Sequence, residues 1–398
     1  MARSRKRFAA LLAFAPMALP LAAMAQTVKI GVILTYSGPN AQVGDEMNKG
    51  LDLYVKTHAK DLPPGLKVEL VKRDDTGPNP DVAKRVAQEL ITRQHVQLLA
   101  GEVFSPNAAA IAPMTKQAKM PFVLMNAAGV SIPRISPYIV RTSFTLWQVS
   151  LPMGEWAAKH ECKTAYTAVS DFIPGYDAQG GFTKGFTDNG GKIVGTVRFP
   201  LANPDFVPLL QRIKDAKPEC VFTFVPAGKQ ATAWVKAWSD TGMKEAGIKL
   251  VTTQDVMLDE EMRNMGDIPL GVVSSGNYSV AATRPQNKAF LAAWDKAYGT
   301  SAIPDFTSVG AWDGMAMIFD MLKATKGKFT PDQAMAFFAH WKNPNSPRGP
   351  IMIDPNTRDI IQNIYLRRVE KEGGKLANVE FATFKMMKDP WKELNPAK

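Results

Sequence analysis

The feature of this chain that most constrains its fold is a regular alternation between short apolar segments and longer helical segments. The clearest instance covers residues 98–129, where an apolar run at 98–101 predicts a strand, 106–119 a helix and 121–125 a second strand. Strands that alternate with helices of about ten to fifteen residues need crossover connections, which are right-handed and build parallel sheets. We therefore expect an α/β fold.

The alternation occurs in two successive runs, which predicts two doubly wound parallel sheets. The first run should hold strands at residues 28–34, 66–73, 98–101, 121–125 and 138–142 and helices at 45–59, 80–93 and 106–119. The second should hold strands at 165–169, 192–199, 220–225, 249–253 and 272–278 and helices at 147–160, 178–189, 205–216 and 229–241. Two helices, 286–298 and 308–325, and an antiparallel strand pair, 349–353 and 360–369, are expected after them.

The length of the chain indicates two domains. Without its first 25 residues the chain of 398 keeps 373, more than one hydrophobic core usually serves. We assign residues 26–143 and 275–350 to a first lobe and residues 144–274 and 351–398 to a second. Because the passages between the lobes are short, we expect a hinge that closes on a ligand between them.

The first 25 residues are predicted to be a targeting segment. They combine a basic start, an apolar stretch at residues 8–21 and a small-x-small site that ends at Ala25, which is the order of a secretory signal peptide. We expect cleavage after Ala25. The two cysteines, Cys162 and Cys220, lie far downstream, so the lipid attachment of bacterial lipoproteins is not available. The mature protein is therefore expected to be soluble and periplasmic.

The charge pattern argues against nucleic acid as a partner. The precursor carries a net charge of +11, which falls to +7 when the four basic residues of the targeting segment are removed. The remaining basic residues are scattered among acidic ones, whereas a nucleic-acid-binding protein gathers them in a patch or stripe. After the targeting segment, no stretch approaches the ~20 apolar residues of a membrane helix.

A candidate ligand site lies where two neighbouring strands of the first run end. Ser105 is expected at the N-cap of a helix and Pro106 at its first position, so that unpaired backbone N–H groups face an anionic ligand. Asn126, Ala127 and Ala128 follow the next strand and are small enough to bring a ligand against the backbone. Both strand ends open into the crevice where open α/β sheets bind ligands. Ser-Pro helix starts and small-residue loops also occur without any ligand.

Other reactive residue types give no metal or cofactor site. Asp74 and Asp75 lack further oxygen ligands at calcium-loop spacing, so we interpret them as a turn and N-cap pair. The four histidines are isolated near helix ends. Cys162 and Cys220 are predicted at the amino ends of neighbouring strands in a 2-1-3 sheet order, where an oxidising compartment would allow a disulfide.

Seven phrases in order resemble the periplasmic solute-binding proteins of branched-chain amino acid ABC transporters. They are VKIGVILTYSGPNAQVG, VELVKRDDTGPNP, LLAGEVFSPNAAAIAPMTKQAKMPFV, YIVRTSF, AVSDFIPGYDAQGGFTKGF, DFVPLLQRIKDAKPECVFTFVPAG and VTTQDVM. The resemblance covers essentially the whole mature chain. It implies a type I periplasmic binding fold of venus-flytrap shape, a small solute between two lobes, an inner-membrane permease as partner, and a monomer.

The resemblance also implies roles for particular residues. Ser105 and the loop of Asn126, Ala127 and Ala128 would hold a ligand carboxylate. Tyr176 matches a tyrosine of the second lobe that closes over the ligand, and Asp255 looks like the acidic residue that accepts a ligand ammonium. With a ligand that has no ammonium, Asp255 would bind a hydroxyl or cap a helix.

Several aromatic residues depart from the pattern of amino-acid receptors and resemble the branch of the family that takes aromatic carboxylates. Phe104, Trp147 and Phe172 are expected near the pocket, where they would stack on a ring. For Phe104 the alternative is a surface contact with the closed second lobe, and for Trp147 it is helix packing. Tyr36, in the first strand-to-helix loop, would either line the pocket or be an ordinary loop residue. A branched-chain or other amino acid and an aromatic acid thus remain alternative ligands.

The chain is not expected to be an enzyme. It has no Gly-x-Ser-x-Gly elbow, no Gly-x-Gly-x-x-Gly, no phosphate loop and no Cys or His pair at zinc spacing. A hydrolase with a different site is the weaker alternative. A sensory receptor module of the same fold is another, although such a module would normally continue into a membrane span or signalling domain.

Overall fold

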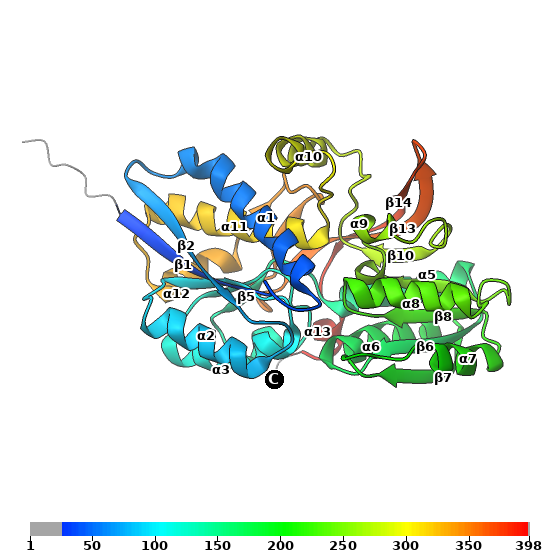
Figure 1. Cartoon of the computed structure of the whole chain (residues 1–398). Helices are drawn as coiled ribbons and strands as arrows, with labels where there is room; N and C mark the ends of the chain where they lie inside the picture. Colours follow the sequence, from blue (N-terminus) through cyan, green and yellow to red (C-terminus); the bar gives the residue numbers. More distant parts are fainter. Residues whose placement is uncertain (1–25, 397–398) are drawn as a thin grey trace, which may run out of the picture.

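The computed structural model describes residues 26–396, so the predicted targeting segment lies outside the described residues. Two α/β bodies lie side by side, each built on its own sheet (Figure 1). No helix within 26–396 combines the length and the apolarity needed to cross a membrane.

The first body is built on a parallel sheet of five strands in the order β2-β1-β3-β4-β5. The strands are β1 (Gln26–Leu34), β2 (Leu66–Asp74), β3 (Leu98–Gly101), β4 (Phe122–Leu124) and β5 (Ile139–Arg141). Its helices are α1 (Ala41–His58), η1 (Ala59–Asp61), α2 (Pro80–Thr92), α3 (Ser105–Ala118), α4 (Ile132–Ile135), α10 (Pro285–Tyr298), α11 (Phe306–Thr325) and α12 (Pro331–Ala339).

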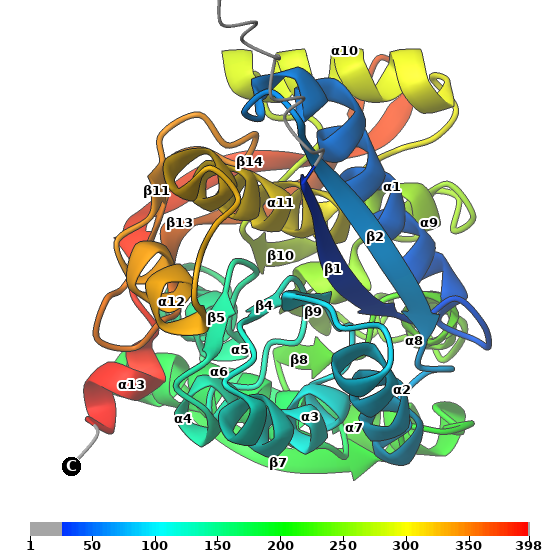
Figure 2. The same cartoon turned by 90° about the vertical axis from the view of Figure 1, so that its left-hand side faces the viewer.

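Helices cover both faces of this sheet, as a parallel sheet requires. Side chains of β1 alternate between the two faces: Ile30 and Val32 pack with residues of α1 and α11, whereas Ile33 packs with residues of α2 and α3. Figure 2 shows the two helix layers on opposite sides of β1. Because successive side chains of a strand point to opposite faces, β1 contributes residues to two separate hydrophobic clusters.

The second body is built on a nine-stranded sheet. Its path is β11-β12-β13-β10-β9-β8-β6-β7, and β14 pairs with β13. The strands are β6 (Thr164–Ser170), β7 (Lys192–Phe199), β8 (Cys220–Phe224), β9 (Lys249–Thr253), β10 (Val273–Gly276), β11 (Lys342–Asn343), β12 (Ile351–Ile353), β13 (Ile360–Glu372) and β14 (Lys375–Met387). The helices are α5 (Leu146–His160), α6 (Ile173–Asp188), α7 (Val207–Asp215), α8 (Lys229–Asp240), η2 (Gln254–Val256), α9 (Asp259–Met262) and α13 (Pro390–Leu394).

The predicted α/β class and the alternation of strands and helices are confirmed. Strands β6 to β10 are parallel in the order 2-1-3-4-5, and β12 and β13 form the expected antiparallel pair. Strand β14 and helices α12 and α13 were not expected. The residues of β14 are half-exposed and mix polar with apolar types, so pairing with β13 rather than apolar periodicity makes this segment a strand.

A buried hydrogen-bond network joins the passages between the two bodies. The carbonyl oxygen of Ser143 accepts from the Arg348 guanidinium at 2.9 Å and from the Gln362 amide at 3.0 Å. The amide nitrogen of Asn277 donates to Gln362 Oε1 at 3.0 Å, and Arg348 Nε pairs with Asp313 Oδ2 at 2.8 Å. Residues of three separate passages are thus fixed to one another away from water.

A disulfide joins Cys162 and Cys220 at the amino ends of β6 and β8. Their Cα atoms lie 6.0 Å apart, and both side chains are buried. The two strands are direct neighbours, which is the arrangement that the 2-1-3 order predicts.

We expect the double variant Cys162→Ser/Cys220→Ser to remain folded but less stable. A cross-link that closes a loop of 58 residues removes denatured-state entropy worth about 4 kcal/mol, and measured losses are typically about 2–4 kcal/mol. Urea unfolding of the oxidised wild type and the variant measures the difference. Equal stabilities, or two free thiols in the denatured and non-reduced wild type, would contradict the prediction.

Candidate ligand-binding site

A cavity lies between the two bodies, at the carboxyl ends of strands from both sheets. Its empty space measures about 450 Å³, part of it open to solvent. Among residues 26–396, Asp255 is the one ionisable side chain that lines it. The lining residues from the first body are Asn40, Val43, Val103, Phe104, Ser105, Asn126, Ala128 and Phe306; those from the second body and the hinge are Phe144, Leu146, Phe172, Pro174, Phe224, Pro226, Ala227 and Asp255.

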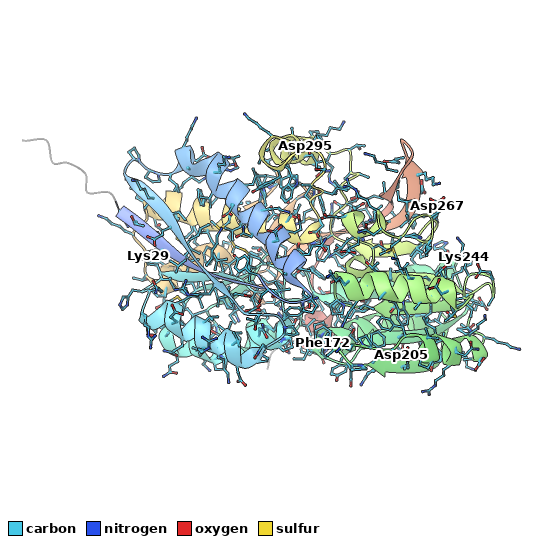
Figure 3. The ribbon with its side chains drawn as sticks, viewed as in Figure 1. Lys29, Phe172, Asp205, Lys244, Asp267 and Asp295 are labelled. Atoms are coloured by element: carbon cyan, nitrogen blue, oxygen red, sulfur yellow. A yellow bond between two sulfur atoms is a disulfide. The ribbon has the colours of Figure 1, made fainter. Side chains whose placement is uncertain are left out.

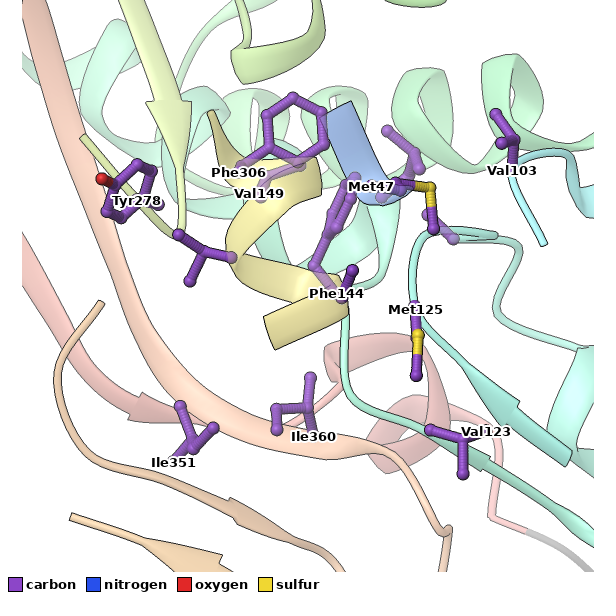
Figure 4. Close-up of a cluster of buried hydrophobic side chains, with 14 of the residues drawn as sticks. Met47, Val103, Val123, Met125, Phe144, Val149, Tyr278, Phe306, Ile351 and Ile360 are labelled. Carbon is purple, nitrogen blue, oxygen red and sulfur yellow. The ribbon is translucent and has the colours of Figure 1, made fainter. Parts of the chain in front are cut away.

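Five phenylalanine rings form much of the cavity wall. The rings of Phe172 and Phe224 stack with centroids 6.0 Å apart, and Phe172 lies at the junction of the two bodies (Figure 3). Phe144 and Phe306 meet edge to face at 5.5 Å (Figure 4). The fifth ring, of Phe104, is 5 % exposed. Flat apolar walls from both bodies favour a flat apolar ligand.

Ser105 supplies a polar group to this apolar space. Helix α3 begins at Ser105 and its N-cap is Phe104, so the predicted N-cap role of Ser105 is wrong by one residue. The Ser105 hydroxyl accepts a hydrogen bond from the Gly129 N–H at 2.9 Å instead of capping its own helix. Among the described residues, none accepts the hydroxyl proton, which leaves one donor for a ligand.

Some residues of the loop after β4 line the cavity, and others are buried in the protein interior. Asn126 and Ala128 line the cavity as expected, and the Asn126 side chain donates to the Val103 carbonyl at 3.0 Å. Ala127 does not line it, because its N–H donates to the Glu102 carbonyl at 3.1 Å and its side chain packs in the hydrophobic cluster beneath α3.

Asp255 brings a carboxyl group into the cavity from the second body. It lies on η2 directly after β9, is 7 % exposed, and accepts a hydrogen bond from the Thr253 hydroxyl at 3.0 Å. Burial raises the pKa of Asp255 to about 7, and the Thr253 hydrogen bond offsets part of that rise. Asp255 therefore readily accepts a proton or a hydrogen bond from a ligand.

Tyr176 does not reach the cavity. Helix α6 begins at Ile173, five residues before the predicted start, so Phe172 and Pro174 line the cavity and Tyr176 lies on the outer side of the first turn. Tyr176 is 43 % exposed, donates its hydroxyl to Asp171 at 2.8 Å, and lies under the Arg198 guanidinium.

Tyr36 and Trp147 also lie outside the cavity lining. The N–H of Tyr36 donates to Asp74 at 2.9 Å and its hydroxyl to Asn48 at 3.1 Å. The Trp147 ring packs against Gly180 of α6, so closely that a Cβ atom added at Gly180 would lie 3.0 Å from Cζ2 of the tryptophan ring. A capping box at Thr145 starts α5 one residue before the predicted start and turns Leu146 rather than Trp147 into the cavity.

Sequence reasoning missed most of the wall from the second body. Phe224 is the last residue of β8, and Pro226 and Ala227 follow it as Asn126 and Ala128 follow β4, so the same signal of a loop at a strand end could have found them. Phe144 and Phe306 carry no such signal, because they reach the cavity only through the packing of the two bodies.

Comparisons with known proteins agree with this geometry. A family model described as periplasmic binding protein matches residues 27–375. The Leu/Ile/Val-binding protein homolog 6 of Brucella melitensis is 43 % identical over 374 residues, which cover 93 % of this chain and 94 % of the relative.

Solved structures extend the comparison to bound ligands. A solute-binding protein of an ABC transporter from Rhodopseudomonas palustris BisB5, in complex with 3,4-dihydroxybenzoic acid, is 46 % identical with a TM-score of 0.88 and covers 92 % of this chain and 99 % of its own. A second, from R. palustris in complex with 4-hydroxybenzoate, has the same identity and TM-score and covers 92 % and 98 %. A leucine-binding protein from Thermotoga maritima, 21 % identical with a TM-score of 0.78 and coverages of 90 % and 99 %, shares the fold.

We expect Asp255→Asn to stabilise the ligand-free protein increasingly as the pH rises. The folded-state pKa of Asp255 lies above the unfolded value of about 3.9, so ionisation destabilises the folded state between about pH 4 and pH 7 and by a constant amount above that range. A folded-state pKa of about 7 against an unfolded value of about 3.9 corresponds to a gain at pH 8 on the order of 4 kcal/mol. Thermal unfolding from pH 4 to pH 8 measures it, with the exposed Asp240→Asn as control. A gain independent of pH would contradict the argument.

Proposed function

Because the chain belongs to the periplasmic binding protein family of ABC transporters, we propose that it captures an aromatic carboxylate of the hydroxybenzoate kind for import. The observation that carries this proposal is the set of five phenylalanine rings, contributed by both bodies and the hinge, around a cavity with few polar groups. The two R. palustris relatives with bound benzoic acids support it.

The ligand carboxylate is proposed to bind at Ser105. The Ser105 hydroxyl is free to donate, and the first N–H groups of the 14-residue helix α3 carry the positive end of its dipole. Because no lysine or arginine of the part of the chain that the structure describes lines the cavity, these neutral donors and the dipole together have to stabilise one negative charge.

The ring of the ligand is proposed to lie between the phenylalanines, with a hydroxyl donating to Asp255. A leucine-type ligand is the second candidate, favoured by the name of the Brucella relative, and would place its ammonium on the same carboxylate. Five rings suit an aromatic ligand better than a branched aliphatic one, since ring pairs add stabilisation beyond buried area.

Ligand binding is proposed to stabilise the closed arrangement of two lobes, residues 26–143 with 275–350 and residues 144–274 with 351–398. The two halves already touch: at the cavity the Asn40 amide donates to the Ala227 carbonyl at 3.4 Å, and elsewhere the Val130 N–H donates to Asp177 at 3.0 Å. A ligand that contacts both halves adds affinity for the closed state alone, which favours closure.

The proposal includes the cellular context that the family implies. The chain is exported to the periplasm, loses residues 1–25 by cleavage after Ala25, binds its ligand as a monomer and passes it unchanged to an inner-membrane permease.

We expect 4-hydroxybenzoate to raise the melting temperature of the mature protein and benzoate to raise it less, because benzoate leaves Asp255 without a hydroxyl. Thermal shift and titration calorimetry with 4-hydroxybenzoate, benzoate and leucine test this. Asp255→Ala should remove the preference for the hydroxyl. A shift with leucine alone would overturn the aromatic ligand and assign Asp255 to an ammonium.

We expect Ser105→Ala to raise the Kd for 4-hydroxybenzoate about 10- to 100-fold, because it removes a donor to the carboxylate and the acceptor of the Gly129 N–H. Calorimetric titration measures the change, and the exposed Ser131→Ala is the matched control. Unchanged affinity in Ser105→Ala would place the carboxylate elsewhere.

A further inference from the structure

Two buried acidic residues, Asp75 and Glu102, lie behind the proposed carboxylate site and have no part in the mechanism described so far. Asp75 directly follows β2 and Glu102 directly follows β3, and neither exposes any surface. Such a pair is unusual beside a site for an anion, because two carboxylates in a dry interior repel each other and the ligand.

Asp75 is the member of the pair with the fuller set of hydrogen-bond donors. Its Oδ1 accepts from the Thr35 hydroxyl at 2.6 Å and the Gly77 N–H at 3.0 Å, and its Oδ2 accepts from the Asn107 amide at 3.0 Å. Three donors are what a buried carboxylate needs in order to keep its charge.

Glu102 lacks such partners. Its Oε1 accepts from the Phe104 N–H at 3.3 Å, and its Oε2, taken as a carboxylate oxygen, has no partner among the described residues. Burial, together with the charge of Asp75 and a hydrogen bond between the two carboxyl groups, raises the pKa of Glu102 well above its usual range. A proton on Glu102 satisfies the second oxygen by donating to Asp75.

The backbone of Glu102 ties together the two loops of the carboxylate site. Its N–H donates to the Ile33 carbonyl at 2.7 Å and its carbonyl accepts from the Ala127 N–H at 3.1 Å. Its φ of 67° lies in the left-handed region, which residues with a side chain rarely adopt. The Glu102 side chain, through the Phe104 N–H, fixes the loop that carries Phe104 and Ser105. The Glu102 carbonyl, through the Ala127 N–H, fixes the loop of Asn126 and Ala128.

We propose that Glu102, held in its protonated form by Asp75, is the positioning residue that presents Ser105 and residues 126–129 to the ligand carboxylate. This inference rests on the proposed function. In the protonated state Glu102 keeps the acceptor for the Phe104 N–H without adding a second negative charge beneath the bound anion.

A ligand-free measurement tests the protonation. Within the described residues, Asp75 is the titratable group that faces Glu102, and its other neighbours, the Phe104 N–H and the Asn107 side chain, are uncharged. Because the pKa of Glu102 is raised by folding, the wild type should lose stability relative to Glu102→Gln as the pH rises from about 4. We expect the difference in melting temperature to grow steadily from pH 5 to pH 8. A constant difference would overturn the proposal, whether or not any ligand binds.

A binding measurement tests the positioning. At pH 7, Glu102→Gln should bind 4-hydroxybenzoate with a Kd within about threefold of wild type, because the amide accepts from Phe104 and donates to Asp75 as the acid does. Glu102→Ala should raise the Kd at least about tenfold, whereas Glu372→Gln, at the exposed end of β13, is the control. Wild-type affinity in Glu102→Ala, or a tenfold loss in a folded Glu102→Gln, would overturn the proposal.

If Glu102→Ala does not fold, the Kd of Glu102→Gln alone tests the proposal. Glutamine has the shape of protonated glutamic acid and no charge, so it shows whether the site needs a neutral group or a carboxylate at position 102. If the wild type does not bind 4-hydroxybenzoate, the proposed function fails, and the ligand-free pH measurement still decides whether Glu102 carries the proton.

Discussion

The arrangement of the two bodies depends on one buried carbonyl oxygen, that of Ser143. It accepts hydrogen bonds from Asn277 in a second passage of the chain through the hinge and from Arg348 and Gln362 in a third. A guanidinium without water needs its full set of partners, and Asp313 supplies the opposite charge. These groups have all their hydrogen-bond partners only when the three passages lie correctly against one another. The network therefore fixes where each body begins, and hence which strand ends face the cavity.

The ligand site follows from that placement. Each sheet ends its parallel strands at the cavity, so short loops from both bodies deliver small residues and phenylalanines to a common space. The polar groups are few and each is held by the protein: Ser105 by Gly129, Asp255 by Thr253. Rigid placement of a small number of polar groups among apolar walls is the usual basis of selectivity in small-molecule sites.

The sequence predicts the architecture well because apolar periodicity and strand-end chemistry are local properties. Five residues that could be identified directly line the cavity from positions just beyond strand ends: Phe104, Ser105, Asn126, Ala128 and Asp255. Tyr176 and Trp147 lie outside the cavity lining, because the direction in which each points depends on where a helix begins to within one turn: α6 starts at Ile173 and α5 is set by the Thr145 cap. Trp147 instead packs on α6, the alternative expected for it. Phe144, Phe306 and the pairing of Glu102 with Asp75 depend on contacts between distant segments, which no local pattern encodes.

The cavity lining within residues 26–396 contains no basic residue, which has a consequence for which aromatic acids can enter. On the proposed orientation, the site compensates a single negative charge at Ser105, and Asp255 lies against the other end of the ring. A dicarboxylate with its two carboxyl groups para to each other, such as terephthalate, would bring a second anion to a buried acid, with no cation among the described lining residues to neutralise either. The receptor would thus separate monoacids from diacids of nearly the same shape, so that charge at the far end of the ring, rather than ring size, limits what is imported.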